Sequence, residues 1–262
     1  MKTNLIKFHS CHPENKNTDK FKPSAVKAHI PQWYLDKDKH KKNPDGQYTL
    51  SISYKNGETD ISRIPSWKSC PAMLDIFLSG YYLFTPCDIE VKNNPEYPEK
   101  GGPVVLEFDP KWGTSQLGMA ICRSRGIEEG LPFPDGYYEH TYIWTPNWFI
   151  EVPEGYTALV SHPININALP FKTISGFIDA SNILVSSGNF PFYVKEGWTG
   201  IIPAGTPYAQ IIPIKNESWE SDIVEYTDEE LDQYLEKRHR EYMVGHGLTK
   251  YKELDWLKKH YE

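Results

Sequence analysis

The chain is predicted to be a mainly antiparallel β protein, and three features of the sequence indicate it. Aromatic residues make up 14% of the 262 residues, and large flat side chains are enriched in strands. The chain also holds 21 prolines and 18 glycines, which mark many turns and favour short strands over long helices. From residue 137 to residue 214, short apolar runs alternate with Pro/Gly turns at the spacing of a sandwich or barrel.

The region before this block mixes strands with short helices. Residues 1–30 are polar and lysine-rich and are expected to form an N-terminal extension with one short strand near residues 4–9. A short helix is expected at residues 30–34. Residues 48–54 alternate apolar and polar side chains, and the following Asn56-Gly57 pair predicts a hairpin with residues 60–64 as its second strand.

A short internal helix is predicted at residues 71–79, because Pro71 suits the first helical turn and Gly80 suits the end of a helix. Strands are expected at residues 81–84, 88–91 and 104–108. Residues 109–136 are rich in glycine and proline and have weak periodicity, which predicts a long loop. The expected β domain covers residues 31–226, with its core at about residues 137–215.

A pair of helices is predicted at the C-terminal side, in residues 227–262. Thr227 and Glu230 have the spacing of a capping box, which favours a helix from there to about residue 243, where Gly245 would end it. Residues 250–261 carry apolar side chains at helical spacing and predict the second helix.

Charge and hydropathy exclude several classes of function. The formal net charge of −7 argues against binding a nucleic-acid polymer, since that affinity comes mainly from neutralised phosphates. No stretch approaches the ~18 to 20 apolar residues of a membrane-spanning helix. The N-terminus lacks an apolar signal region, and the four cysteines form no Cys-x-x-Cys pair. A cytoplasmic location with reduced thiols is therefore expected, in the host cytoplasm if a phage encodes the chain.

Three short motifs within residues 150–214 resemble the β-clip fold of the dUTPase and dCTP deaminase superfamily. They are the segment 152–160, the Gly-Phe-Ile-Asp sequence at 176–179, and the Ala-Gln pair within 207–212. Their order and approximate spacing match the family over about 65 residues, a quarter of the chain. Taken as a whole, the chain resembles a phage or bacterial family built around this fold. The resemblance implies an antiparallel β-clip barrel or sandwich.

The resemblance also implies roles for individual residues. Asp179 would be the catalytic residue that orients water or a ribose hydroxyl, as general base or hydrogen-bond acceptor. The residues expected to bind the ligand lie in the phosphate loop and on the later strand: Ser161, His162, Asn165, Tyr208 and Gln210. By analogy the protein would be a homo-oligomer, a trimer with sites between subunits, and Mg²⁺ would accompany nucleotide hydrolysis.

Departures from the family pattern argue against a competent dUTPase. No arginine occurs in residues 161–165, so the strongest phosphate contact is missing. Ala180 and Ser181 follow Asp179 where the family has Tyr-x-Gly, and predicted helices follow where the family has a Gly-rich arm. The function expected is binding of a nucleotide or nucleotide-like ligand, with or without hydrolysis. The alternative is a non-catalytic structural or binding module, such as a virion component or a nucleotide sponge.

Each candidate residue also has a purely structural interpretation. Asp179 could be a turn residue that accepts backbone hydrogen bonds, Gln210 could satisfy backbone groups, and His162 could cap a loop. Trp144, Trp148 and Trp198 could stack on a base, but packing in a β core is the commoner use of tryptophan.

Metal chemistry is the second alternative. Residues 203–208 are similar to the second cupin motif and residues 136–155 to the first, which points to His140 and Glu139 as ligands. Tyr208 stands where the second motif would supply a histidine, so the metal set is incomplete. His9, Cys11 and His12 have suitable side chains for zinc, but their spacing matches no closed zinc site. No metal site is predicted.

Overall fold

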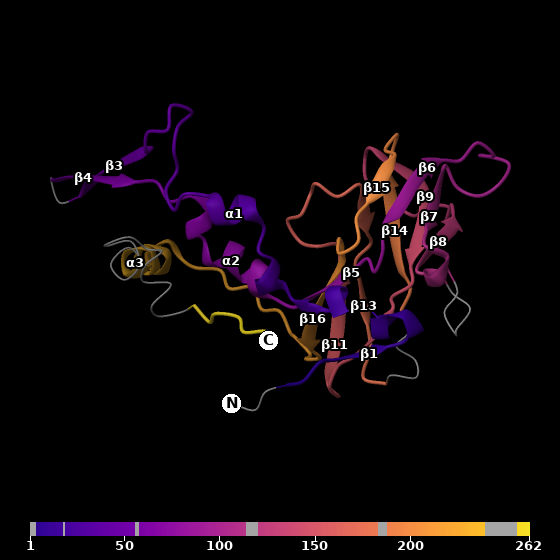
Figure 1. Ribbon diagram of the computed structural model, residues 1–262. Coiled ribbons are helices and arrows are strands. Elements are labelled where there is room, and N and C mark those ends of the chain that lie inside the picture. The colour runs from indigo at the N-terminus through magenta and orange to yellow at the C-terminus, as the bar shows by residue number, and fades with distance from the viewer. Residues whose placement is uncertain (1–3, 18, 56–57, 114–119, 183–187, 239–255) are drawn as a thin grey trace. The chain divides into compact units, whose positions relative to one another are not determined.

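The computed structural model describes residues 4–17, 19–55, 58–113, 120–182, 188–238 and 256–262 (Figure 1). The chain divides into two compact units. The first contains residues 1–26 and 80–217 with residue 262, and the second contains residues 27–79 and 218–261. The predicted β domain of residues 31–226 is therefore divided between the two units. Each unit is described by itself.

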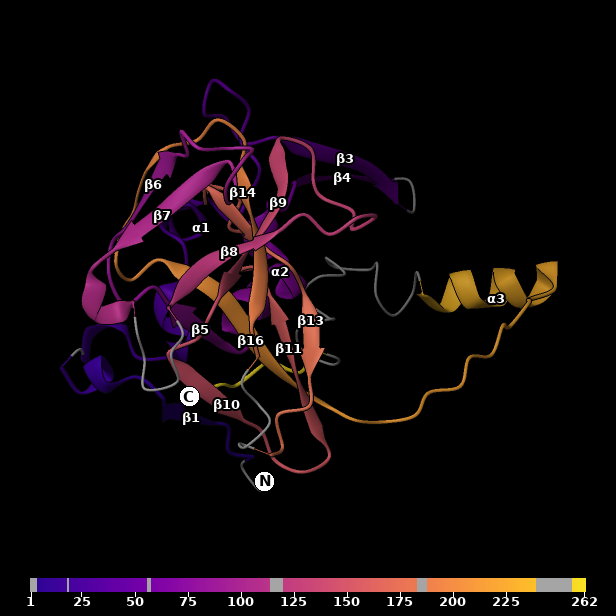
Figure 2. The same cartoon turned by 90° about the vertical axis from the view of Figure 1, so that its right-hand side faces the viewer.

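The first unit confirms the mainly antiparallel β prediction. Its largest sheet has five strands in the order β13 (Gly176–Ile178), β11 (Tyr156–Ser161), β16 (Pro207–Lys215), β5 (Tyr81–Phe84) and β2 (Ser24–Ala25). Figure 2 shows β5, β16, β11 and β13 beside one another. Strand β16 lies at the centre, so its backbone is hydrogen-bonded on both sides.

Three smaller sheets complete this unit, and every strand pair described is antiparallel. A four-stranded sheet has the order β12 (Phe171–Thr173), β14 (Phe190–Lys195), β9 (Tyr137–Trp144) and β8 (Cys122–Gly126). A three-stranded sheet has the order β15 (Gly200–Ile202), β6 (Ile89–Asn93) and β7 (Val104–Phe108). Strand β1 (Lys7–Ser10) pairs with β10 (Trp148–Glu151).

Aromatic side chains fill the core of the first unit. The ring of Trp144 stacks on Phe192 with centroids 3.9 Å apart, and Phe171 meets the same tryptophan edge-on at 5.0 Å. Tyr208 lies 5.1 Å from Trp144. All four side chains are buried. Trp144 therefore packs in the core, as the structural interpretation of the tryptophans predicts, and Trp198 packs against the same cluster while partly exposed.

The long loop predicted at residues 109–136 is wrong in part, because it contains regular structure. A short 3₁₀ turn covers Pro110–Trp112, and strand β8 follows at Cys122–Gly126. Trp112 is fully buried and anchors the segment, while β8 forms the edge of the four-stranded sheet. Most of the side chains of β8 are exposed. A polar edge strand of this kind lacks the alternation of apolar residues that identifies a strand in sequence.

The second unit contains the helices and one hairpin. Its helices are α1 (Gln32–Asp36), α2 (Pro71–Leu78) and α3 (Asp228–Arg238). Its strands are β3 (Leu50–Lys55) and β4 (Glu58–Arg63). It also contains the 3₁₀ turn Trp67–Ser69 and most of the 3₁₀ turn Val26–His29, whose first residue belongs to the first unit. Strands β3 and β4 pair as the predicted hairpin. Its expected Asn56-Gly57 turn lies outside the described residues. Two further 3₁₀ turns, Pro13–Asn17 and Asp19–Phe21, belong to the first unit.

Helix α2 matches its prediction and ends where glycine was expected to stop it. Pro71 lies in the first turn, and Gly80, just beyond the helix, has φ +76°. The side chain of Phe77 is buried and its ring lies 4.8 Å from that of Tyr34 in α1. Aromatic packing between these two short helices offsets the low stability that each would have alone.

The described residues test the predicted C-terminal helix pair only in part. The capping box is present, since the carboxylate of Glu230 accepts the backbone N–H of Thr227 at 2.9 Å. Helix α3 begins as predicted and is described to Arg238, and residues 239–255 lie outside the description. The second helix is predicted at residues 250–261: its first half lies outside the described residues, and residues 256–261 are not helical. There the indole N–H of Trp256 donates to the carboxylate of Asp75 at 3.0 Å. Within the described residues, no helix combines the length and the apolar character needed to cross a membrane.

The junction at Gly80 gives a testable prediction about packing. A Cβ atom at this position would overlap the carbonyl oxygen of Ile211 and would also carry the strain of a positive φ. We expect Gly80→Ala to lower the free energy of unfolding by about 2–5 kcal/mol, since strain contributes about 1–2 kcal/mol and overpacking about 1–3 kcal/mol. Gly155→Ala is the matched control, because Gly155 also has a positive φ, +79°, but open space around it. Equal losses in urea unfolding would contradict this account.

Candidate functional site

The residues predicted to bind phosphate lie around the end of β11. Ser161 ends this strand and pairs directly with Gln210 of the central strand β16. The side chain of Gln210 is fully buried, and its Oε1 accepts the backbone N–H of Ile164 at 3.0 Å. A buried amide that bonds a loop in this way fixes the loop against the sheet.

His162 holds the same loop from its other side. Its Nδ1 accepts the backbone N–H of Thr173 in β12 at 3.3 Å, so its Nε2 carries the proton and donates to the carbonyl of Ile166 at 3.0 Å. Burial lowers the pKa of His162, and the nearby charge of Lys172 also lowers it. The ring is therefore neutral at pH 7 and serves as a fixed link between the loop and β12.

The tip of this loop has an uncommon backbone conformation. Asn165 has φ +62°, and among the described residues it is the one non-glycine residue with a positive φ. Its side chain is exposed, while the next N–H, that of Ile166, donates to the carbonyl of Pro163 at 3.1 Å. Asparagine tolerates this conformation better than most residues. We call residues 161–166 the β11 loop.

Ser161 contributes a buried hydroxyl at the base of the β11 loop. Its Oγ is buried and has no hydrogen-bond partner among the described residues. Buried polar atoms without partners are uncommon in proteins and require an explanation such as a bound water or ligand. The fold thus brings Ser161, His162, Asn165 and Gln210 together around the β11 loop.

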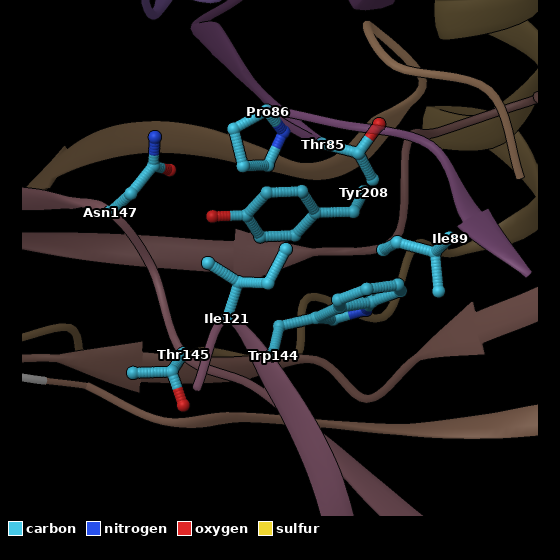
Figure 3. A pocket seen from close by; sticks show the side chains of 8 residues that line it. All are labelled: Thr85, Pro86, Ile89, Ile121, Trp144, Thr145, Asn147 and Tyr208. Atoms are coloured by element: carbon cyan, nitrogen blue, oxygen red, sulfur yellow. The ribbon is translucent and has the colours of Figure 1, made fainter. Parts of the chain in front are cut away.

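Tyr208 lies apart from this loop, inside the core. Its ring lies between Pro86 and Ile121 and its hydroxyl points toward Asn147, beside a cavity with room for about one water molecule (about 10 Å³) (Figure 3). The hydroxyls of Tyr208 and Thr145 have no partner in the described part of the chain. Burial raises the pKa of Tyr208 far above its usual value, so the phenol stays protonated. This geometry suits an internal water better than contact with a nucleotide.

The N-terminal segment closes this region through a pair of asparagines that the sequence does not signal. The side chain of Asn147 donates to that of Asn15 at 2.8 Å, and Asn15 donates to the carbonyl of Asn147 at 2.6 Å. Both side chains are buried. The two residues are 132 positions apart, and no local pattern in a single sequence indicates such a contact.

Asp179 lies away from the β11 loop within the chain. It follows β13, whose Ile178 pairs with Ala158 of β11, so Asp179 falls opposite Thr157. Ser161 is four residues further along β11, which at about 3.3 Å per residue is about 13 Å away. The side chain of Asp179 is exposed. One copy of the chain therefore does not bring Asp179 and the β11 loop into a common site.

The side chains considered for metal binding are engaged elsewhere. His140 is buried and its Nε2 lies 2.7 Å from the hydroxyl of Ser124, while the neighbouring Glu139 is exposed. His9 lies 2.7 Å from the carboxylate of Glu151. Among the residues that the structure describes, no three His, Cys, Asp or Glu side chains gather to hold a metal ion.

The other two N-terminal candidates also have separate partners. The thiol of Cys11 donates to the carbonyl of Pro146 at 3.4 Å. The ring of His12 packs on Trp112 with centroids 4.5 Å apart. Cys11, Cys70, Cys87 and Cys122 are all free thiols. Burial raises the pKa of Cys11 to about 11, so its thiol stays protonated at pH 7.

Neither a protein-family model nor a curated protein matches the sequence. Solved structures of phage dUTPases are similar to a part of it. A dUTPase from phage phi11 of S. aureus shares 17% identity, with a TM-score of 0.23, over 41% of this chain and 97% of its own. A variant of the Staphylococcus bacteriophage 80alpha dUTPase with dUpNHpp shares 15%, with a TM-score of 0.23, over 41% and 89%.

Buried histidines predict a loss of stability in mild acid. Burial lowers the pKa of His12, His140 and His162 below the ordinary value of 6.5. The unfolded chain therefore binds more protons than the folded chain as the pH falls below about 6.5. Between pH 7 and pH 5 we expect the free energy of unfolding to fall, by at most about 1.4 kcal/mol per pH unit for each histidine.

The matched variant for this pH dependence is His162→Gln, which keeps a polar side chain without a titrating ring. It should unfold in urea with a smaller change between pH 7 and pH 5 than the unmodified chain. An identical pH dependence in the two proteins would show that His162 does not titrate in this way.

Proposed function

We propose that the chain binds a nucleotide or nucleotide-like phosphate ligand at the β11 loop. The observation that carries this proposal is the organisation of the loop before any ligand binds. Gln210 and His162 fix its backbone from two sides, and Asn165 holds a positive φ at its exposed tip. Backbone conformations of this kind cost about 1–3 kcal/mol and occur often at ligand sites.

A loop fixed in this way loses little conformational freedom on binding. The exposed side-chain amide of Asn165 would donate a hydrogen bond to a phosphate oxygen. Lys172 is exposed in the neighbouring β12, and its charge reaches His162. We infer that this lysine supplies the positive charge that the family obtains from arginine. A single lysine makes a point contact instead of a bidentate one, so the expected affinity is modest.

Hydrolysis would need more than one copy of the chain. Because Asp179 is about 13 Å along β11 from the loop, it could serve this loop only from another subunit. This requirement agrees with the homo-oligomer, a trimer by analogy, that the sequence predicts. Mg²⁺ would then neutralise the phosphates during turnover. The cytoplasmic location stays a prediction.

A non-catalytic module, either a virion component or a nucleotide sponge, is the second candidate. The observation that favours it is the use of the predicted ligand residues within the fold. Gln210 and His162 already bond the backbone of their own loop, and Tyr208 lies in the core. Asp179 is exposed beside a strand end, where an aspartate commonly serves only as a turn residue.

Thermal unfolding with a panel of nucleotides tests the proposed function. A ligand present at 100 times its Kd stabilises the folded state by about 2.7 kcal/mol, so the Tm should rise with a nucleoside triphosphate such as dUTP. Lys172→Gln should reduce this rise. Lys195→Gln, at an exposed position in the same sheet, is the matched control and should not. If no nucleotide raises the Tm of the unmodified protein, the result contradicts the binding proposal and favours the non-catalytic structural module.

The same protein and its Asp179→Asn variant separate binding from turnover. The variant should keep the nucleotide-dependent rise in Tm and lose any release of phosphate. Equal phosphate release by both proteins would remove Asp179 from the proposed chemistry while leaving the binding proposal intact.

A further inference from the structure

The β3–β4 hairpin presents an uncovered apolar face. Ile52 pairs directly with Ile61, and Leu50, two residues before Ile52, lies on the same face. Their side chains are 55–60% exposed. Ser51 and Ser62 pair on the opposite, polar face. Strands β3 and β4 form a sheet of only two strands, and an isolated hairpin is marginally stable in water unless its apolar face packs on something.

Positive charge borders this apolar face at the base of the hairpin. Arg63 pairs with Leu50, and its guanidinium lies 4.0 Å from the centre of the Tyr48 ring. The segment of residues 36–42 adds four lysines and two aspartates. It runs beside the hairpin, since the N–H of Lys41 donates to the carbonyl of Ile64 at 2.8 Å. The side chains of Lys41 and Arg63 are exposed.

Helix α3 has the complementary character. Leu231, Tyr234 and Leu235 form one stripe at i, i+3 and i+4 spacing, and each is 42–50% exposed. Asp228 and Asp232 lie along one edge of this stripe by helical periodicity. The helix sequence DEELDQYLEKR holds five acidic and two basic residues, a net charge of −3. A helix uncovered on its apolar stripe and acidic along its edge is suited to an apolar face with a basic border.

The two surfaces also match in length. Helix α3 has 11 residues, which at 1.5 Å per residue is about 16 Å. Each strand of the hairpin has six residues, which at about 3.3 Å per residue is about 20 Å. The helix could therefore lie along the hairpin without overhanging it. In one copy of the chain the apolar residues of both surfaces are exposed, so its own α3 does not cover its hairpin.

We propose that the apolar face of the β3–β4 hairpin binds helix α3 of a second copy of the chain. The contact is formed by Leu50, Ile52 and Ile61 on one copy against Leu231, Tyr234 and Leu235 on the other. Lys41 and Arg63 face the acidic edge of the helix. When each of two copies both gives a helix and receives one, the contact closes into a two-fold symmetric dimer. The inference stands on the second unit alone and does not depend on nucleotide binding.

Charge reversal tests this contact and distinguishes exchange between copies from packing within one copy. The hairpin variant is Lys41→Glu with Arg63→Glu, and the helix variant is Asp228→Lys with Asp232→Lys. Each variant alone places like charges across the contact, and its dissociation constant, measured by light scattering or sedimentation, should rise at least tenfold. An equimolar mixture of the two variants pairs opposite charges at both contacts and should recover the mass of the unmodified oligomer.

Ser51→Glu is the matched control, because Ser51 lies on the polar face of the same hairpin. It should leave the oligomer mass unchanged, and far-UV circular dichroism should show that all variants remain folded. Two results would overturn the proposal. One is an unchanged mass for both charge-reversal variants. The other is a loss of mass in each variant that the mixture does not recover, which would place α3 on the hairpin of its own chain or elsewhere.

Discussion

The hydroxyl and backbone of Thr173 connect the two largest sheets with the β11 loop. Its Oγ1 accepts the indole N–H of Trp144 at 3.2 Å and donates to the carbonyl of Tyr208 at 2.6 Å. Thr173 and Trp144 belong to the four-stranded sheet and Tyr208 to the five-stranded one. The backbone N–H of the same threonine bonds Nδ1 of His162. Thr173 is buried. If its hydroxyl were removed, the indole N–H of Trp144 and the carbonyl of Tyr208 would each lose a hydrogen-bond partner that water could not replace.

The candidate site depends on this network because the polar side chains that shape the β11 loop are bonded to buried strands of the core. Gln210 reaches the β11 loop from the central strand, and His162 reaches it from the side of β12. The loop thus takes its shape from packing and hydrogen bonds, while the side chain of Asn165 at its tip is exposed. The same observation explains why a β fold can persist while its chemistry changes, since the residues that shape the loop need not be those that react.

Local patterns in the sequence predict much of the fold. Pro71 and Gly80 delimit α2, Thr227 and Glu230 begin α3, and the alternating runs after residue 137 give most of the strands. Each of these features is decided by propensity, turn chemistry or hydrophobic alternation, all of which can be read from neighbouring residues.

Other features depend on tertiary contacts that a single sequence does not encode locally. Strand β8 is polar because it lies at a sheet edge, and its pairing with β9 decides its conformation. Tyr208 is one of the strand residues near Gln210, but the sequence does not indicate that its side chain enters the core. The position of Asp179 along β11 follows from the register of β13, which no motif specifies. The sequence can therefore name candidate residues more readily than it can predict how far apart their side chains lie in the fold.

The most direct test of the account is the nucleotide-dependent Tm of a Thr173→Val variant. Valine keeps the shape of threonine and removes the hydroxyl that joins Trp144 to Tyr208, so the free energy of unfolding should fall by about 1–3 kcal/mol. Valine keeps the backbone N–H that donates to Nδ1 of His162, so the β11 loop is affected only through a shift of β12 against β16 when the hydroxyl bonds are lost. We expect this shift to loosen the loop, and the rise in Tm with dUTP should shrink. A variant as stable as the unmodified protein, with an unchanged response to dUTP, would contradict the claim that this network shapes the β11 loop.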